Sequence, residues 1–471
     1  MSSDRAWSFS DSLEEAVNAA GDPVELMRDL GVGEFTKVPD EFTHWIEEQR
    51  SWRENCAFAD QSYHMTDHYV EGPDALELYK DHAVNNFENS EPGTAKQLVV
   101  ANPNGYFIGD AIWFHLGDDK FLSVGGAAAH NWLQYNIETG DYDVSGEIQS
   151  RPVQTGEDPN NFRFQVQGPE AIKIMEQATD GPLPDLGFFN FETVSIDGHE
   201  VNLLRHGMAG EPGFEFWGPY EEGEAVRTAV LEAGEDYGIT RLGGESYQTP
   251  NAILGWIPLV VPAIYDEGMT DYREWLNVGQ GLLSIGGSYD SDDIADYYFT
   301  PPELGYGHII DFEHDFVGSE PLKDELDNSE REKVTLVWDG EDVVEVFASL
   351  FTDGDTYQFM DLPHPRSAAC HYDEVSKDGE TIGVSTDKSY IYNERALLSL
   401  AVVDTEYSDP GTEVTLVWGD ACFQNSRSSS IDSGVGPRTE PTDARPKLHS
   451  STIQRRGSIT RARSPTRTTT P

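Results

Sequence analysis

The sequence predicts an α+β protein in which a duplicated unit is followed by a small β-domain. The first observation behind this prediction is a strand, a Gly-Pro pair and a helix that occur twice, at Gly72-Pro73 and at Gly168-Pro169, 96 residues apart. The second is a β-rich stretch over residues 330–419, where Gly and Asp separate runs of β-forming residues. Because self-similarity marks internal repeats, we interpret the two units as a duplication. The alternative is chance recurrence of a common strand-to-helix turn.

Residues 1–54 are expected to form a helical N-terminal extension. Apolar residues recur there with helical spacing in three stretches, residues 11–20, 23–30 and 41–53. From residue 55 the pattern changes to short runs typical of strands, so the duplicated part is expected to begin there.

Residues 55–325 are expected to hold both copies of the unit. In each copy the proline stands in the first turn of the helix, where a missing N–H is harmless. Turns at Asn104-Gly105 and Asp197-Gly198 favour hairpins between the strands. The expected strands are residues 57–60, 68–71, 97–101, 106–116, 120–124, 162–167, 200–205 and 214–217, and further helices are expected at 130–138 and 222–237.

Residues 326–422 are expected to form a separate small barrel or sandwich. Its strands are predicted at residues 333–338, 343–351, 383–385 and 413–418, where β-forming residues alternate or cluster.

Residues 423–471 differ in kind from the rest of the chain. They hold nine basic and three acidic residues, whereas the preceding residues hold 22 basic and 82 acidic ones. This Ser-, Thr-, Arg- and Pro-rich tail has no periodicity and is expected to be disordered. It is either a regulatory or nucleic-acid-binding arm or, the interpretation we favour, the product of a reading-frame shift near residue 420.

The composition excludes several classes of protein. Apolar residues make up 38% and aromatic residues 11% of the chain, which excludes wholesale disorder. The net charge of −54 repels phosphate groups, so no nucleic-acid or anionic-membrane partner is expected for the acidic body. The acids are spread evenly and only 10 residues are Lys. Such a surface favours a halophile's protein, whose self-repulsion is screened by salt; an unusually acidic mesophilic protein is the alternative.

The cysteines and the apolar runs predict a cytoplasmic protein. The three cysteines, Cys56, Cys370 and Cys422, are far apart and odd in number, which disfavours a disulfide framework. No apolar run approaches the length of a membrane span, and the N-terminus does not resemble a secretory signal.

The common catalytic motifs are absent from the sequence. It has no P-loop, no dinucleotide-binding Gly-x-Gly-x-x-Gly, no His-Glu-x-x-His and no Gly-x-Ser-x-Gly. There is no Cys-x-x-Cys, and the pair His64 and His68 lacks a third ligand, so no metal is expected. What remains is a set of loops rich in Gly, carboxylate, His and Tyr, at residues 60–65, 102–110, 205–215 and 243–247. Taken singly, each of these loops could equally well be an ordinary hairpin or turn.

Taken together, these loops resemble the family of the glycine-cleavage T-protein, an aminomethyltransferase that binds tetrahydrofolate between three domains. Gly-Glu-Pro-Gly-Phe-Glu at 210–215 is similar to the family's Gly-Glu-Asp-Gly-x-Glu. Gly-Tyr-Gly at 305–307, Asp-Phe at 311–312 and residues 314–318 follow the family's order. The resemblance implies a three-domain clover of two α+β domains and a C-terminal β-barrel, with tetrahydrofolate in the central cavity.

Glu215 falls on the pterin-binding glutamate of that family. A pterin presents an amino group and a ring N–H side by side, and one carboxylate can accept both. The alternative is that Glu215 merely ends a strand. One departure is Gly109, which stands where T-proteins carry an Asp near the reactive folate nitrogens, and it disfavours aminomethyl transfer.

A closer resemblance is to the folate-dependent O-demethylases of methoxylated aromatic acids, the vanillate and syringate type. It extends over about residues 20–420 and implies methyl transfer from an aryl ether to folate. The matching stretches are Asp60-Gln61-Ser62-Tyr63-His64-Met65, Phe107-Ile108-Gly109-Asp110, Leu204 to Gly210, Gly255-Trp256-Ile257-Pro258 and Tyr272-Arg273-Glu274-Trp275-Leu276.

The resemblance also implies roles for single residues. An ether methyl leaves poorly because the departing group is an oxyanion, so a proton donor at that oxygen is expected to help. Tyr247 matches the tyrosine implicated in the demethylases, and its phenol stays protonated at neutral pH. His64 is a second catalytic candidate or, alternatively, a structural histidine. Substrate contacts are expected from Gln61, Tyr63 and Lys37, and cofactor contacts from Glu215, Asp110, Met208 and Arg205.

The identity of the methyl donor is left open by a second departure from the pattern of the demethylases. The vanillate-type enzymes hold the substrate carboxylate with an Arg. In this chain Gly126 occupies the matching position. Lys37 could supply the cation instead, while another aryl ether, a sulfonium or a quaternary ammonium compound remains an alternative donor.

Three functions are therefore weighed. The first is a tetrahydrofolate-dependent demethylase acting on a small molecule. The second is aminomethyl transfer from a carrier protein. The third is a non-catalytic folate-binding module, although the Lys-x-Cys-Tyr-x-Gly-Gln-Glu signature of such relatives is absent.

Overall fold

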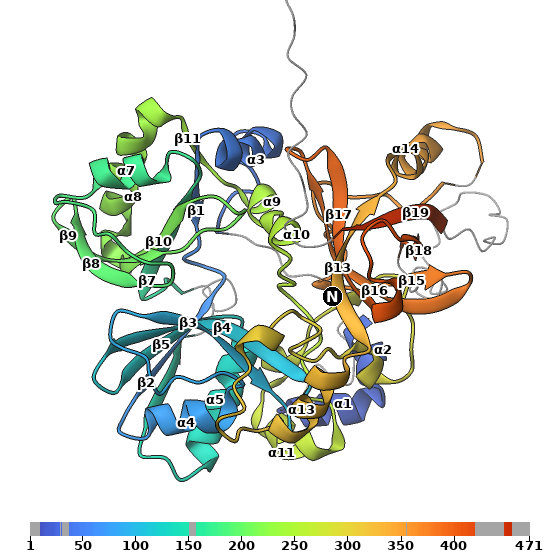
Figure 1. Ribbon diagram of the computed structural model, residues 1–471, viewed down its shortest axis with the longest axis horizontal. Helices are drawn as coiled ribbons and strands as arrows, with labels where there is room; N and C mark the ends of the chain where they lie inside the picture. Colours follow the sequence, from blue (N-terminus) through green and yellow to red (C-terminus); the bar gives the residue numbers. More distant parts are fainter. Residues whose placement is uncertain are drawn as a thin grey trace, which may run out of the picture.

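The computed structural model shows three lobes around a central pair of short helices, α9 (Gly244–Tyr247) and α10 (Pro250–Leu254) (Figure 1). Each of two lobes has one β-sheet and its helices, and the third is a barrel. The structure describes residues 10–28, 30, 37–149, 157–354 and 356–419 and the backbone of 447–454.

The first sheet has the order β3-β4-β5-β2-β6, and all its neighbouring strands are antiparallel. Helices α4 and α5 pack on one face, where alternate apolar side chains of the strands form the largest core of the molecule. The elements are β2 (Thr66–Glu71), α4 (Ala75–His82), β3 (Ala95–Ala101), β4 (Phe107–Gly117), β5 (Lys120–Gly125), α5 (Ala127–Thr139) and β6 (Ser145–Gln149).

The second sheet has the order β11-β1-β7-β10-β9-β8, with only the β1–β11 pair parallel. Helices α7 and α8 cover one face and enclose a separate core. The elements are β1 (Cys56–Asp60), β7 (Asn161–Gln167), α7 (Ala171–Ala178), β8 (Phe191–Ile196), β9 (His199–Arg205), β10 (Gly213–Pro219), α8 (Gly223–Gly234) and β11 (Ile239–Arg241).

The repeated Gly-Pro turn has the same conformation in both lobes, as a duplication requires. Gly72 has φ +147° and Gly168 has φ +138°, which L side chains rarely adopt. A Cβ at Gly72 would lie 2.3 Å from the backbone oxygen of Asp143, and one at Gly168 would lie 2.5 Å from that of Asn55. Each turn therefore needs glycine for its φ angle and for the close approach of another backbone segment.

The third lobe is a closed barrel with the order β13-β17-β16-β15-β18-β19. Its core is formed by apolar side chains such as Leu336, Ala401 and Leu416. Strands β15 and β17 are additions to the strands expected from sequence. The elements are β13 (Arg331–Trp338), β15 (Asp373–Lys377), β16 (Glu380–Ile391), β17 (Ala396–Asp404), β18 (Glu413–Val417) and β19 (Lys447–Gln454).

One predicted strand of this lobe is wrong. Residues 343–351 lie in helix α14 (Gly340–Ala348) and the 3-10 turn η7 (Ser349–Phe351). Asp339 caps the helix, because its carboxylate accepts the backbone N–H of Glu341 at 2.7 Å. Val343, Val346 and Phe347 pack on the barrel core at helical spacing. The valine content suggested a strand, but the cap and the spacing specify a helix.

The tail also departs from expectation at one point. Residues 423–471 are predicted to be disordered, whereas β19 within them pairs with β13 and with β18 and so completes the barrel. The two neighbouring strands would otherwise present unpaired N–H and C=O groups, which readily bind another strand. The remainder of the tail lies outside the described residues.

The N-terminal helices and the segment after α10 connect the lobes. Helix α3 packs against β1, and α1 packs against α11 and α12 beside the first lobe (Figure 1). No helix in the described part of the chain is long and apolar enough to cross a bilayer. The further elements are α1 (Leu13–Ala20), α2 (Pro23–Arg28), α3 (Trp45–Glu54), η2 (Tyr220–Glu222), η3 (Glu235–Tyr237), η4 (Glu267–Met269), α11 (Thr270–Trp275), α12 (Val278–Gly281), β12 (Ile285–Gly286), η5 (Ile294–Tyr297), η6 (Gly307–Ile309), α13 (Ser319–Asn328), β14 (Cys370–His371) and η8 (Thr405–Tyr407).

Candidate active site

The candidate site lies on the face of the second sheet that α7 and α8 do not cover. Successive side chains of a strand point to opposite faces. Phe164 and Phe216 belong to the core under the helices, so Gln165 and Glu215 must point away from it. Gln165 lies directly opposite Glu215 in the β7–β10 pair. Two strand neighbours therefore present an amide and a carboxylate side by side.

Glu215 forms a buried ion pair with Arg163. Nη1 of Arg163 lies 2.7 Å from Oε1 of Glu215, and each of the two residues is only 2% exposed. The other terminal nitrogen, Nη2, lies 3.7 Å from a carboxylate oxygen of Asp67 on β2 of the first sheet. The guanidinium thus bridges the two lobes.

The charge of Glu215 is maintained by its neighbours. Burial alone would raise the pKa of this carboxyl, but His206 and Arg163 outweigh burial, and its pKa lies below the ordinary value. Nδ1 of His206 lies 3.6 Å from Oε2 of Glu215. Glu215 is therefore an ionised acceptor in an otherwise desolvated position.

Tyr247 ends the short helix α9, which Glu48 holds in place. The buried carboxylate of Glu48 accepts the backbone N–H of Gly243 at 2.7 Å and also bonds the hydroxyl of Ser246. From this position the Tyr247 hydroxyl lies 2.9 Å from Nε2 of Gln61. Nε2 of Gln61 also lies 3.3 Å from Oε1 of Gln165, which connects Tyr247 to the sheet face.

The direction of the Gln61–Tyr247 hydrogen bond matters chemically. An amide nitrogen can only donate, so the phenol oxygen of Tyr247 accepts and its own hydrogen is available for another partner. Burial raises the pKa of Tyr247 well above its ordinary value, so the phenol stays protonated at neutral pH. The ring of His64 packs edge-on against Tyr247, with 5.1 Å between the ring centroids.

The three predicted substrate residues do not form a single cluster. Gln61 lies in the centre, whereas Tyr63 lies at the end of the sheet, with its hydroxyl 3.1 Å from that of Tyr220. Lys37 joins Tyr63 there, with its Nζ 6.0 Å from the ring centroid. These contacts place a cation and two phenols beside the loop that carries Gln61 and His64.

Asp110 belongs to a different buried group. Its Oδ2 accepts hydrogen bonds from Tyr306 at 2.6 Å, Gln97 at 2.8 Å and Trp256 at 3.1 Å. Burial raises the pKa of Asp110 despite these bonds. Among the described residues, no hydrogen bond or ion pair joins Asp110 directly to Glu215 or Tyr247.

Arg205 ends strand β9, and Met208 lies on the loop between β9 and β10. Nη1 of Arg205 donates to the backbone oxygen of Gly213 at 3.1 Å, and the guanidinium stacks on Phe214. Arg205 thus holds the two ends of this loop together. Met208 is buried beside Ala209, which adopts a positive φ of 59°. A cofactor contact from either predicted residue stays a prediction.

Comparison with known proteins identifies the family of this chain. The profile described as GCVT N-terminal domain matches residues 13–251, half of the chain. The chain belongs to the GCVT family. A syringate O-demethylase of Sphingobium sp. is 39% identical to it over 87% of this chain and 90% of the relative. A sesamin methylene transferase of Sinomonas sp. is 31% identical over 74% of this chain and 78% of the relative.

Aminomethyltransferases are also among the relatives of this chain. That of Lysinibacillus sphaericus is 25% identical over 81% of this chain and 87% of the relative. The glycine cleavage system aminomethyltransferase T from Bartonella henselae shares the fold, with a TM-score of 0.57 at 17% identity, over 85% of this chain and 91% of that structure. The expected T-protein-like fold and family are thereby confirmed.

The central face of this GCVT-family chain has buried polar atoms that the described residues leave without a hydrogen bond. Oε1 of Gln61 and Nε2 of Gln165 are buried, and within the described chain neither has a hydrogen-bond partner. Buried polar atoms are rarely left unpaired, so these atoms fit a polar ligand. A small cavity adjoins them, lined by Gln61, Ser62, Met65, Asp67, Gln149, Pro159, Asn161 and Arg163.

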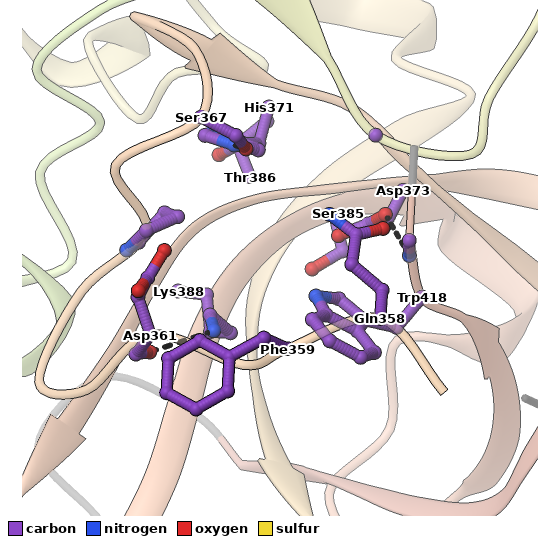
Figure 2. Close-up of a pocket in the computed structure, with 13 residues that line it drawn as sticks. Gln358, Phe359, Asp361, Ser367, His371, Asp373, Ser385, Thr386, Lys388 and Trp418 are labelled. Atoms are coloured by element: carbon purple, nitrogen blue, oxygen red, sulfur yellow. Dashed lines mark hydrogen bonds between the residues drawn. The ribbon is translucent and has the colours of Figure 1, made fainter. Parts of the chain in front are cut away.

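A second cavity lies in the barrel and contains none of the predicted site residues (Figure 2). Its buried Lys388 donates to the backbone oxygen of Asp361 at 3.2 Å and lies against the ring of Trp418. Asp373 accepts the N–H of Gly419 on the opposite side. In the described part of the chain, no group of three His, Cys, Asp or Glu could hold a metal ion.

Sequence reasoning missed three residues of the centre: Arg163, Gln165 and His206. Arg163 and Gln165 lie on a strand that was predicted, and the period-2 pattern Phe-Arg-Phe-Gln-Val-Gln placed both on its polar face. That signal could have identified them. His206 lies within the matched stretch Leu204 to Gly210 but was given no role, and only the fold brings it to Glu215.

Proposed function

We propose that this protein is a tetrahydrofolate-dependent O-demethylase that transfers a methyl group from a small, methoxylated aromatic donor to folate. The observation that carries the proposal is the phenol of Tyr247, whose oxygen is held by Gln61 and whose hydrogen is left for a substrate. The 39% identity to a syringate O-demethylase supports it. The family makes folate the expected cofactor.

The residues of the central face are proposed to have separate roles in binding and catalysis. Glu215 would accept the N–H groups of the pterin edge, with Gln165 beside it on the neighbouring strand. Tetrahydrofolate, when bound, supplies the nitrogen that accepts the methyl group. As the ether C–O bond breaks, Tyr247 donates its proton to the departing oxygen, so a neutral phenol leaves rather than a phenolate. His64, packed on the Tyr247 ring, is proposed to fix its orientation.

The donor is proposed to bind between Tyr247 and the group formed by Lys37 and Tyr63. Gly126 supplies no side chain for a donor carboxylate, whereas Lys37 provides a cation near the ring of Tyr63. A methoxylated benzoate is therefore the first donor class to test.

Aminomethyl transfer is the second candidate, and one observation counts against it. T-proteins carry an Asp where this chain has Gly109, and a Cβ at Gly109 would lie 2.7 Å from the backbone nitrogen of Ala129. The first turn of α5 thus occupies the space of that side chain. The aminomethyltransferase relatives keep the candidate open at the level of the family.

Tyr247→Phe tests the proposed mechanism. It should lower the rate of methyl transfer by roughly 10²–10⁴-fold, the usual contribution of a positioned acid, while the Kd for tetrahydrofolate stays unchanged. Single-turnover kinetics and titration calorimetry measure the two quantities. Tyr237→Phe is the matched control, because that hydroxyl bonds Gln177 on the outer side of the second lobe. Unchanged turnover in Tyr247→Phe would remove this residue from the mechanism.

The working environment is proposed to be a cytosol of high salt. The net charge of −54 and the scarcity of lysine support this, since salt screens the repulsion among surface carboxylates. Dialysis into dilute buffer should unfold the protein, as followed by circular dichroism. A fold that persists in dilute buffer would contradict the halophilic assignment.

A further inference from the structure

Arg163 stands at the junction between the two sheets and the candidate site. It projects from β7 of the second sheet, and its guanidinium is 5.1 Å from the ring centre of Trp217 and 5.8 Å from that of Phe114 on the first sheet. Its carboxylate partners are Glu215 on its own sheet and Asp67 on the first. Nothing in the proposed chemistry so far requires a buried arginine at this place.

The burial of Glu215 explains why a cation is needed beside it. A carboxyl without a compensating charge in such a place takes up a proton, because the charged form is poorly solvated. A protonated carboxyl has one oxygen that donates, so it can no longer accept two neighbouring N–H groups. Pterin recognition at Glu215 therefore depends on a cation that keeps the group ionised without competing for the pterin.

We propose that Arg163 is this positioning residue: it holds the Glu215 carboxylate ionised and fixed in orientation for the pterin, without touching the pterin itself. This inference rests on the proposed function, in which Glu215 binds folate. The geometry fits, because Nη1 engages Oε1 only, while Nη2 is turned toward Asp67. Oε2, which faces Nδ1 of His206 at 3.6 Å, and the second lone pair of Oε1 are left for the ligand.

The planar fork explains why the residue is arginine. One guanidinium forms ion pairs with carboxylates on two different sheets and stacks on two aromatic rings. A lysine ammonium is a compact point charge and cannot make all of these contacts at once. Lysine should therefore keep Glu215 ionised but hold it less firmly.

The test is the pH dependence of tetrahydrofolate binding, measured anaerobically by titration calorimetry between pH 5.5 and 8.5. In the wild type, Kd should vary little with pH over this range. In Arg163→Met, Kd should rise at least about tenfold at pH 7 and rise further as pH falls, because the pKa of Glu215 increases when the cation is removed. At the lowest pH the Kd of Arg163→Met should approach that of Glu215→Gln.

Two variants separate positioning from folding. Arg163→Lys should restore a pH-independent Kd, within about tenfold of wild type. Arg273→Met removes another buried arginine, which lies away from the site and pairs with Glu14 at 2.6 Å. This variant should leave the pH profile unchanged even if stability falls. If Arg163→Met does not fold, Arg163→Gln, which keeps donors but no charge, should show the same pH dependence.

The outcomes distinguish the inference from its premise. A wild-type chain that binds no tetrahydrofolate at any pH would overturn the proposed function and this inference with it. A wild-type chain that binds, together with uncharged Arg163 variants whose pH profiles run parallel to it, would overturn the inference alone.

Discussion

The two sheets share one repeated unit but differ in what they bury. The face of the first sheet toward the second lobe is largely apolar, with Phe114, Leu122 and Val124 packed against Trp217. The facing side of the second sheet carries Arg163, Gln165 and Glu215. The duplicated turn builds the same scaffold twice, and only the second copy directs a charged pair and an amide toward the centre.

The first lobe also buries two histidines, His68 on β2 and His82 on α4, in the neutral form. Burial lowers the pKa of His68 and of His82 to about 4 each, and a hydrogen bond with Gln134 only partly opposes this at His68. The second sheet instead pairs its buried charges. The first lobe therefore buries its histidines without their charge, while the second keeps the buried charged pair to which the proposed function assigns the chemistry.

The largest effect is expected from adding a side chain to the first sheet. Gly109→Asp introduces the T-protein residue where a Cβ would lie 2.7 Å from the Ala129 backbone. It should destabilise the protein by about 4 kcal/mol or more, as overpacking combined with a buried charge does. Denaturant unfolding measures this. Gly117→Asp on the same strand is the control, since its Cβ would meet nothing within 4 Å. Equal stability of the two variants would contradict the crowding argument against aminomethyl transfer.

The neutral histidines predict a particular loss of stability in acid. Their pKa is lower in the folded chain than the ordinary value of about 6.5, so their contribution is complete above about pH 6.5 and is lost as pH falls toward 4. Unfolding free energy at constant high salt should fall by roughly 2–5 kcal/mol between pH 6.5 and 4.5. His68→Gln should flatten this decline. A decline identical to wild type would mean that His68 is not buried neutral.

The smallest effect is expected at the rim of the second lobe. Lys37→Met should raise KM for methoxylated benzoates about three- to tenfold with little change in kcat, because an exposed ion pair contributes roughly 1 kcal/mol. The methyl ester of the same donor should show no such difference between wild type and variant. If acid and ester respond equally, Lys37 does not bind the donor carboxylate.

The fold could be predicted from sequence because its signals are local. Alternating strands, the two Gly-Pro turns and the order of the loops specified two α+β units and a β-domain. The prediction failed at α14, where we took the valines as a strand and did not consider the local cap that Asp339 provides. It also failed at β19, because its pairing with distant edges of the barrel is not encoded within a short window.

The site was predicted only in part, for a related reason. Gln61 and Tyr247 are 186 residues apart in the chain, and family resemblance alone connected them before the structure placed them 2.9 Å apart. Arg163 was missed because a charged residue on a strand is more often solvated than buried. Its role appears only when both sheets close around it.

The most direct test of the account is mass spectrometry of the folate product. Wild-type protein in concentrated KCl would be given tetrahydrofolate with methoxybenzoates, betaine, sulfonium compounds or aminomethyl-loaded carrier protein. A 5-methyl product is expected with a methoxybenzoate donor, and Tyr247→Phe should lose that product. A methylene product from the carrier protein, or bound folate with no product from any donor, would contradict it.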